Sequence, residues 1–230
     1  MSAPKVALNN LPIGKDLEVC TYGSLPIPAP AGGLTVTIAV ADPLLAKVSS
    51  DRGVAGSANV NVAVPAGSSA TPTFCLQALA GSGTVAYTAD APDYDQATAT
   101  VSMFPSGFII CRSVSGTSCS GFGGSFSTRL TDADTTLKIA PARLDPVYLN
   151  LAEIQMVRPG VTSGSVAVDS TNPSVGMTTL SPVTFSGGDV PNERTSSFHP
   201  LAAGTTVIQA TAAGFSTASN NNNINVTVTP

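Results

Sequence analysis

The chain has 230 residues, a formal net charge of −4 and a charged fraction of 10%, well below the roughly 25% of an average soluble domain. This acidic balance, with no Lys or Arg cluster, excludes a nucleic-acid-binding surface, because nothing would offset the repulsion of a phosphate backbone. No run of about 18 apolar residues is present, which argues against insertion into a membrane. The 18 Pro and 21 Gly leave no room for long helices.

The first hundred residues predict a series of short strands. Asp42-Pro43 and Pro65-Ala66-Gly67 are turn signals, and similar signals recur about every 8–12 residues, which is typical of an antiparallel β-sandwich. Alternating apolar and polar residues, rich in Val and Thr, mark the strands between these turns. The predicted strands are 17–19, 34–40, 46–48, 58–64, 71–78, 84–89 and 96–103.

The remaining residues predict a second set of strands after a hinge at Phe104-Pro105-Ser106-Gly107. Residues 108–124 form a cysteine-containing N-terminal segment, and the four asparagines before Ile224 form a polar loop ahead of the last strand. The pattern is otherwise the same as in the first set. The predicted strands are 125–130, 136–139, 147–151, 163–169, 183–185, 195–198, 205–210 and 224–229.

The chain nearly repeats itself. Residues 83–94 read GTVAYTADAPDY and residues 204–215 read GTTVIQATAAGF, an offset of about 120 residues. A repeat of this length is a whole domain rather than a solenoid module. We therefore expect an all-β chain of two domains, 1–103 and 104–230, each folded as a β-sandwich.

These segments resemble the immunoglobulin-like tandem repeats of large bacterial secreted and cell-surface proteins. The resemblance rests on PAPAGGLTVTIAVADP (28–43), LAGSGTVAYTADAPDY (79–94), DSTNPSVG (169–176), LAAGTTVIQATAAGF (201–215) and NVTVTP (225–230). The chain departs from the family pattern at Asp93, where glycine is usual, and in the cysteine loop. The resemblance implies two tandem immunoglobulin-like antiparallel sandwiches, in an array that spaces an adhesive or catalytic head from the cell.

Four cysteines allow three complete pairings. Cys111 and Cys119 bracket seven residues with a Ser-Gly pair, so a loop can bring them together and a disulfide is expected. The alternation around Cys20 and Cys75 predicts that both face outward, where they could pair with each other, join another subunit or stay free. A zinc site needs a cluster of Cys or His ligands, whereas the sequence contains no C-x-x-C and only one His. We therefore do not expect a zinc site.

One predicted turn carries three carboxylates, those of Asp90, Asp93 and Asp95. Carboxylate oxygens are ligands of the kind that Ca²⁺ prefers. The alternative is a solvated turn in which the aspartates support their own backbone. Asp132 and Asp134 form a weaker case of the same kind. Calcium is the one cofactor that the sequence suggests.

Tyr94 and Phe215 occupy matching positions in the repeat. One interpretation is an exposed aromatic platform that binds a sugar. The other is a ring packed across the end of the sandwich, and the matching placement favours it.

His199 precedes a turn, and the sequence contains no G-x-S-x-G motif of a hydrolase nucleophile. We therefore expect His199 to be a surface histidine rather than the general base of a hydrolase.

The sequence therefore predicts a non-enzymatic structural spacer of a bacterial extracellular or surface protein. Two alternatives stay open. One is a subunit of a self-assembling surface fibre, joined through outward cysteines or an edge strand. The other is an adhesin module that binds a carbohydrate or a protein. The expected partners are accordingly neighbouring repeats or subunits, or a surface glycan or protein.

Overall fold

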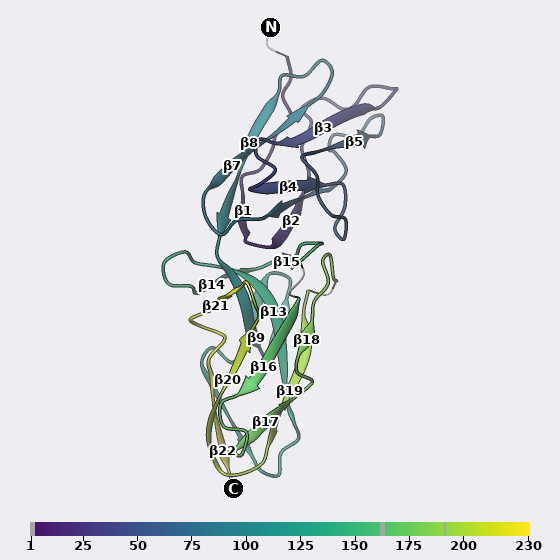
Figure 1. Ribbon diagram of the computed structural model, residues 1–230. Coiled ribbons are helices and arrows are strands. Elements are labelled where there is room, and N and C mark those ends of the chain that lie inside the picture. Colours follow the sequence, from purple (N-terminus) through teal and green to yellow (C-terminus); the bar gives the residue numbers. More distant parts are fainter. Residues whose placement is uncertain (1–2, 162–163, 191) are drawn as a thin grey trace. The chain divides into compact units, whose positions relative to one another are not determined.

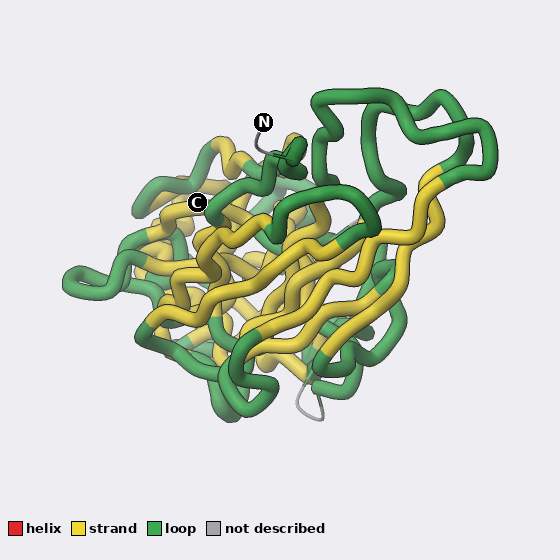
Figure 2. Tube along the Cα trace, turned by 90° about the horizontal axis from the view of Figure 1, so that it is seen from above, coloured by secondary structure: helices red, strands yellow, loops and turns green. Residues whose placement is uncertain are grey.

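The computed structural model describes residues 3–161, 164–190 and 192–230, and within them the chain consists of strands and loops (Figure 2). The predicted all-β class is confirmed, and no helix long and apolar enough to cross a membrane occurs in this part of the chain. The contacts divide the chain into two compact units, coloured purple to teal and teal to yellow in Figure 1. The first ends at Phe104 and also includes Arg158–Gly160, and the second comprises Pro105–Val157 and Val161–Pro230.

The first unit contains two sheets. In the larger, the β1–β8 pair is parallel, and the other pairs are antiparallel. Its order is β1 (Leu11–Gly14), β8 (Ala97–Phe104), β7 (Thr84–Asp90), β3 (Leu34–Val40) and β5 (Asn59–Val64). In the smaller sheet, β2 (Leu17–Thr21), β6 (Phe74–Ala78) and β4 (Ala46–Ser49) lie side by side and antiparallel.

The core of the first unit follows from the alternation seen in the sequence. Every second residue of β3, from Val36 to Val40, is buried. Between the sheets, the rings of Phe74 and Tyr87 meet edge to face at 6.4 Å, a favourable aromatic geometry. The Tyr87 hydroxyl donates to the carbonyl of Asn9, and burial raises the pKa of Tyr87 to about 12. Tyr87 is therefore a core residue with its polar end satisfied.

The second unit repeats this arrangement with additions. Its five-stranded sheet has the order β12 (Ser125–Arg129), β22 (Ile224–Thr229), β20 (Gly204–Thr211), β16 (Ser165–Ser170) and β18 (Val183–Thr184), and β12–β22 is parallel. The facing sheet has the order β17 (Gly176–Thr179), β19 (Arg194–Pro200), β13 (Thr135–Leu144), β9 (Ser106–Cys111) and β21 (Ser216–Thr217). The other strands are β10 (Ser113–Ser115), β11 (Ser118–Ser120), β14 (Leu151–Ile154) and β15 (Met156–Val157).

The repeat found in the sequence corresponds to one strand and its following turn in each unit. Residues 83–94 contain β7 and residues 204–215 contain β20, and each is the third strand in the five-stranded sheet of its unit. The turns match as well: the Tyr94 amide donates to Ala91 O at 3.2 Å, and the Phe215 amide donates to Ala212 O at 3.3 Å. In both five-stranded sheets the first and second strands are parallel, a detail that the antiparallel prediction did not include.

The second core is built around phenylalanines. Phe108 lies 5.2 Å from Phe185 and 4.8 Å from Phe215, measured between ring centroids. Phe198 is fully buried, and a Cβ added to Gly176 would lie only 2.2 Å from its ring. Only glycine at position 176 therefore leaves space for the Phe198 ring.

The strand predicted at 147–151 is wrong, because β14 begins only at Leu151. The Asp145 carboxylate accepts hydrogen bonds from the amides of Val147 and Tyr148 at 3.0 and 2.7 Å, which fold the chain into a turn. Leu149 has a φ of 55°, which no strand allows. The predicted start of another strand at Ser163 lies outside the described residues.

Candidate functional site

The carboxylates proposed for calcium lie along the connection from β7 to β8. Asp90 ends β7, Asp93 has a φ of 65°, and the Asp95 amide donates to Pro4 O at 2.8 Å. Across the described ranges, no three His, Cys, Asp or Glu side chains are gathered where they could hold a metal ion. The geometry therefore supports the turn interpretation, and calcium stays an untested prediction.

Asp132 and Asp134 serve different neighbours. Asp132 Oδ2 accepts from the Arg129 amide at 2.8 Å and from the Thr128 hydroxyl at 3.3 Å, which closes a turn after β12. Asp134 Oδ1 lies 2.7 Å from His199 Nδ1, and both side chains are nearly half exposed. His199 is thus a surface histidine that forms an ion pair with Asp134 when its imidazole is protonated.

Tyr94 lines a groove of about 540 Å³ in the first unit. The Tyr94 hydroxyl donates to Ile27 O at 3.0 Å, so one end of the ring is fixed. Phe215, its counterpart, instead packs on Phe108. The interpretation of a ring packed within the sandwich therefore applies to Phe215, whereas Tyr94 is half-buried in an apolar groove. The lining residues include Pro4, Ile27, Pro28, Pro30, Leu34 and Pro92.

All four cysteines form disulfides within the chain, Cys20 with Cys75 and Cys111 with Cys119. The first joins directly opposite residues of β2 and β6, and the second joins the end of β9 to β11. The prediction that Cys75 faces outward to solvent is wrong, since it is 0% exposed. Residues that follow β4 cover this face of the sheet, which leaves no cysteine for a link to another subunit.

Glu18 is a buried carboxyl that sequence reasoning missed, because the alternation in LEVCT places it on a face expected to be solvated. It is 1% exposed and pairs across the sheet with Gln77. Gln77 Nε2 donates to Glu18 Oε2 at 3.0 Å and to Val54 O at 2.9 Å, and the Gly56 amide donates to Gln77 Oε1. Among the described residues, none forms a hydrogen bond with Glu18 Oε1, and burial raises the pKa of Glu18 to about 7.

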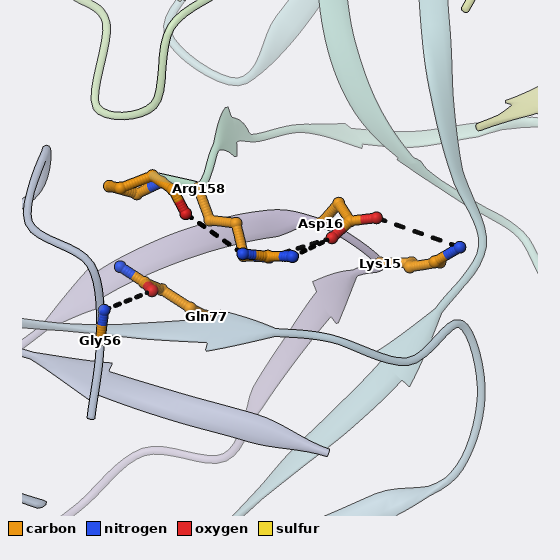
Figure 3. A network of polar contacts seen from close by, with 6 residues as sticks. Lys15, Asp16, Gly56, Gln77 and Arg158 are labelled. Carbon is orange, nitrogen blue, oxygen red and sulfur yellow. Dashed lines mark hydrogen bonds and ion pairs between the residues drawn. The ribbon is translucent and has the colours of Figure 1, made fainter. Parts of the chain in front are cut away.

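An ion pair within the first unit joins residues that are far apart in the sequence. Arg158 Nε donates to Asp16 Oδ1 at 3.0 Å, and the Arg158 amide donates to Asp16 O at 3.1 Å. Figure 3 shows the guanidinium directed at the Asp16 carboxylate, with Lys15 on the other side of that carboxylate. Nothing in the sequence around Arg158 signals this partner.

A second feature missed from the sequence is the turn at residues 145–150, which exposes two apolar side chains. Val147 and Tyr148 are 73% and 71% exposed. Ser219 secures the turn, since its hydroxyl donates to Tyr148 O and its amide donates to Leu149 O at 3.0 Å. Exposed apolar groups on such an ordered turn are suited to contact another molecule.

No protein-family model matches the chain, and no curated protein matches it. Among solved structures, the chain is similar to the D0-D1 domain of intimin, with 11% identity over 98% of this chain and 95% of that one, at a TM-score of 0.32. It is also similar to a C-terminal 282-residue intimin fragment in complex with the intimin-binding domain of the translocated intimin receptor, with 13% identity over 100% and 64% of the two chains and a TM-score of 0.36. The Yersinia pseudotuberculosis adhesin InvE shares 13% identity over 99% and 59%, at a TM-score of 0.29.

Proposed function

We propose that this chain is a non-enzymatic spacer of a bacterial extracellular or cell-surface protein, built from two tandem domains that bear tension. One observation carries the proposal: in the five-stranded sheet of each unit, an early strand lies parallel to the final strand. β1 pairs with β8 from Leu11↔Val101 to Gly14↔Phe104, and β12 pairs with β22 from Ser125↔Asn225 to Arg129↔Thr229.

Parallel pairing determines how tension acts on the hydrogen bonds of a ladder. A force that pulls β1 toward its N-terminal end and β8 toward its C-terminal end drives the two strands in opposite directions along their length. The evenly spaced bonds of a parallel ladder are then loaded together rather than one after another. The Lys15 amide adds a further bond to Phe104 O at 2.8 Å, at the end of β8. Such a unit is suited to hold its length under load.

The two disulfides support an extracellular location. Disulfides form and persist in oxidising compartments and are rare in the cytosol. Each also closes a loop, of 55 residues for Cys20–Cys75 and 8 residues for Cys111–Cys119, and so disfavours the unfolded chain. The two disulfides, together with the sequence resemblance to repeats of bacterial surface proteins, support the proposal of a spacer outside the cell.

The test is to pull the full chain in two directions in a single-molecule force experiment. Attachment at the two chain ends loads the β1–β8 ladder in shear, whereas attachment at Asp90 and Ala97 opens the β7–β8 hairpin from its turn. We expect the first geometry to need a several-fold larger unfolding force for the first unit. Equal forces in both geometries would contradict a load-bearing role.

The groove at Tyr94 favours a second function, a carbohydrate-binding module. Its aromatic ring and fixed prolines offer an apolar surface of the kind on which a sugar ring can stack. Calorimetry against glycans identified on an array tests this function, with Tyr94→Ala as the variant and Tyr22→Ala, an exposed tyrosine outside the groove, as the control. Binding that Tyr94→Ala abolishes and Tyr22→Ala retains would establish it, and no binding by the wild type would exclude it.

A further inference from the structure

The edge strand β5 has main-chain groups that no strand pairs. The Val40 amide donates to Ala58 O at 2.9 Å, and Ile38 lies opposite Val60 in the same antiparallel ladder. Because main-chain groups alternate in direction along a strand, the even-numbered residues of β5 face β3 and the odd-numbered ones face away. The amides and carbonyls of Asn61 and Ala63 therefore point to the free edge, and the described residues provide them no hydrogen-bond partner.

Four other edge strands in the protein carry features that block pairing with a further strand, and the edge strand β17, which has neither a proline nor a charge, has only four residues. β1 contains Pro12, β4 contains Lys47, β12 ends in Arg129, and β18 is only two residues long. β5 has six residues, NVNVAV, without a proline or a charge. The side chains of its odd-numbered residues are exposed, whereas Val62 and Val64 are buried. β5 is thus anchored in the core on one face and open along its edge.

We infer that the free edge of β5 pairs antiparallel with β5 of a second copy of this chain, around a two-fold axis at Asn61. In this register Asn61 lies opposite Asn61 of the other copy, and Asn59 lies opposite Ala63 in both directions. The outward amides and carbonyls of these residues then bond to each other, which joins the larger sheets of two first units into one continuous sheet. The main-chain groups of Asn61 and Ala63 already point outward, and the Asn59 carbonyl, which accepts a hydrogen bond from the Ser57 hydroxyl, uses its second lone pair for the pairing.

Two further observations favour a second copy over a foreign strand. No charged residue occurs between Arg52 and Asp90, so two β5 edges meet without like-charge repulsion. An asparagine amide both donates and accepts, so two facing Asn61 side chains are complementary to each other. Thr37 Oγ1 already donates to Asn61 Oδ1 at 2.8 Å and so orients the amide.

The pairing is independent of the proposed spacer role, since the edge exists in the first unit whether or not the chain bears tension. A single strand pair buries little surface, so the association is weak. It becomes strong only where many copies are held close together, as on a crowded surface.

Cysteine cross-linking of the full chain tests the register directly. Facing residues at a hydrogen-bonded antiparallel position have Cα atoms about 5.5 Å apart, within reach of a disulfide. Asn61→Cys should therefore give a covalent dimer in a glutathione buffer, with the native disulfides verified by peptide mapping. Asn59→Cys alone should not form this dimer, because the two copies of residue 59 lie about 13 Å apart along the strand. A mixture of Asn59→Cys and Ala63→Cys should form it, because these two residues face each other.

The matched control is Thr98→Cys, an exposed position on β8 in the same sheet. Sedimentation velocity up to about 1 mM protein gives an independent measurement. We expect a concentration-dependent dimer that Asn61→Lys abolishes by placing like charges opposite each other, and that Thr98→Lys, with the same net charge, retains. A wild-type monomer at all concentrations, or Asn61→Cys cross-linking no faster than Thr98→Cys, would overturn the inference.

Discussion

The two units share a sheet order but place their stabilising features differently. The first holds its disulfide across the centre of its smaller sheet, beside a buried carboxyl, and leaves a long edge strand open. The second places its disulfide in the segment that precedes the repeat. Its β18 edge is short, and hydroxyls of Ser181 and Thr178 bond the amide and carbonyl of Val168 instead. The same architecture therefore tolerates different ways of satisfying its core and its edges.

The largest expected difference between the units concerns the disulfides. Replacing Cys20 and Cys75 with alanine should lower the free energy of unfolding of the first unit by about 4 kcal/mol, because the unfolded chain is then released from a 55-residue loop. The same change at Cys111 and Cys119 should cost the second unit about 2.5 kcal/mol, since that loop has only 8 residues. Urea denaturation of both variants measures this, and equal losses would contradict the loop-length argument.

Glu18 should make the stability of the first unit depend on pH. Its pKa is raised by burial from 4.5 to about 7, so the folded state binds the proton more tightly than the unfolded state does. Stability is therefore greatest below about pH 4.5 and is lost as the pH rises to 7, by on the order of 3 kcal/mol for this group. In the second unit, by contrast, the Glu193 carboxylate lies 2.9 Å from Lys138 Nζ, and both side chains are partly solvated.

Urea denaturation of wild type and Glu18→Gln at pH 5 and pH 8 isolates this contribution. The variant keeps the shape of the side chain and its capacity for hydrogen bonds, so it should be more stable than the wild type at pH 8 and nearly equal at pH 5. If the difference between the two proteins were the same at both pH values, the buried charge would not be its cause.

A smaller effect is expected at Gly176, where the second core has no spare space. Gly176→Ala should destabilise the second unit by about 2 kcal/mol, because the added methyl group would overlap the Phe198 ring. Gly123→Ala is the matched control, since nothing lies within 4 Å of a Cβ added there. Thermal unfolding distinguishes the two, and similar losses at both positions would show that packing against Phe198 is not responsible.

The smallest effect is expected at the exposed turn of the second unit. Val147→Ser and Tyr148→Ser should each change the free energy of unfolding by less than about 0.5 kcal/mol, because both side chains are largely solvated. Asp145→Ala should cost more, about 1 kcal/mol, since it removes the acceptor for two amides. A large loss from either serine variant would show that the turn is buried in the native protein.

Much of the fold could be predicted because strand alternation is local. The strand predicted at 34–40 is Leu34–Val40 in the structure, and its buried residues are those that the alternation selects. The strand predicted at 147–151 failed because an aspartate side chain competed for the amides of the segment. Local turn chemistry at Asp145 outweighed the apolar pattern of the residues after it.

The site features that the sequence did not predict depend on contacts between distant segments. His199 and Asp134 are 65 residues apart, and Arg158 and Asp16 are 142 apart. The asparagine run predicted as a polar loop contains fully buried Asn222, whose side chain bonds the amide and carbonyl of Ala210 and so replaces a main-chain partner. No local pattern distinguishes this asparagine from its neighbours.

The central claim is that the chain is two load-bearing units in series, and stretching it by its ends tests this most directly. We predict two separate force peaks, each followed by release of one unit. Without reductant the first unit should extend by about 200 Å less than with reductant, because the Cys20–Cys75 disulfide retains 55 residues at about 3.6 Å each. A single peak, or extension without measurable resistance, would contradict the account.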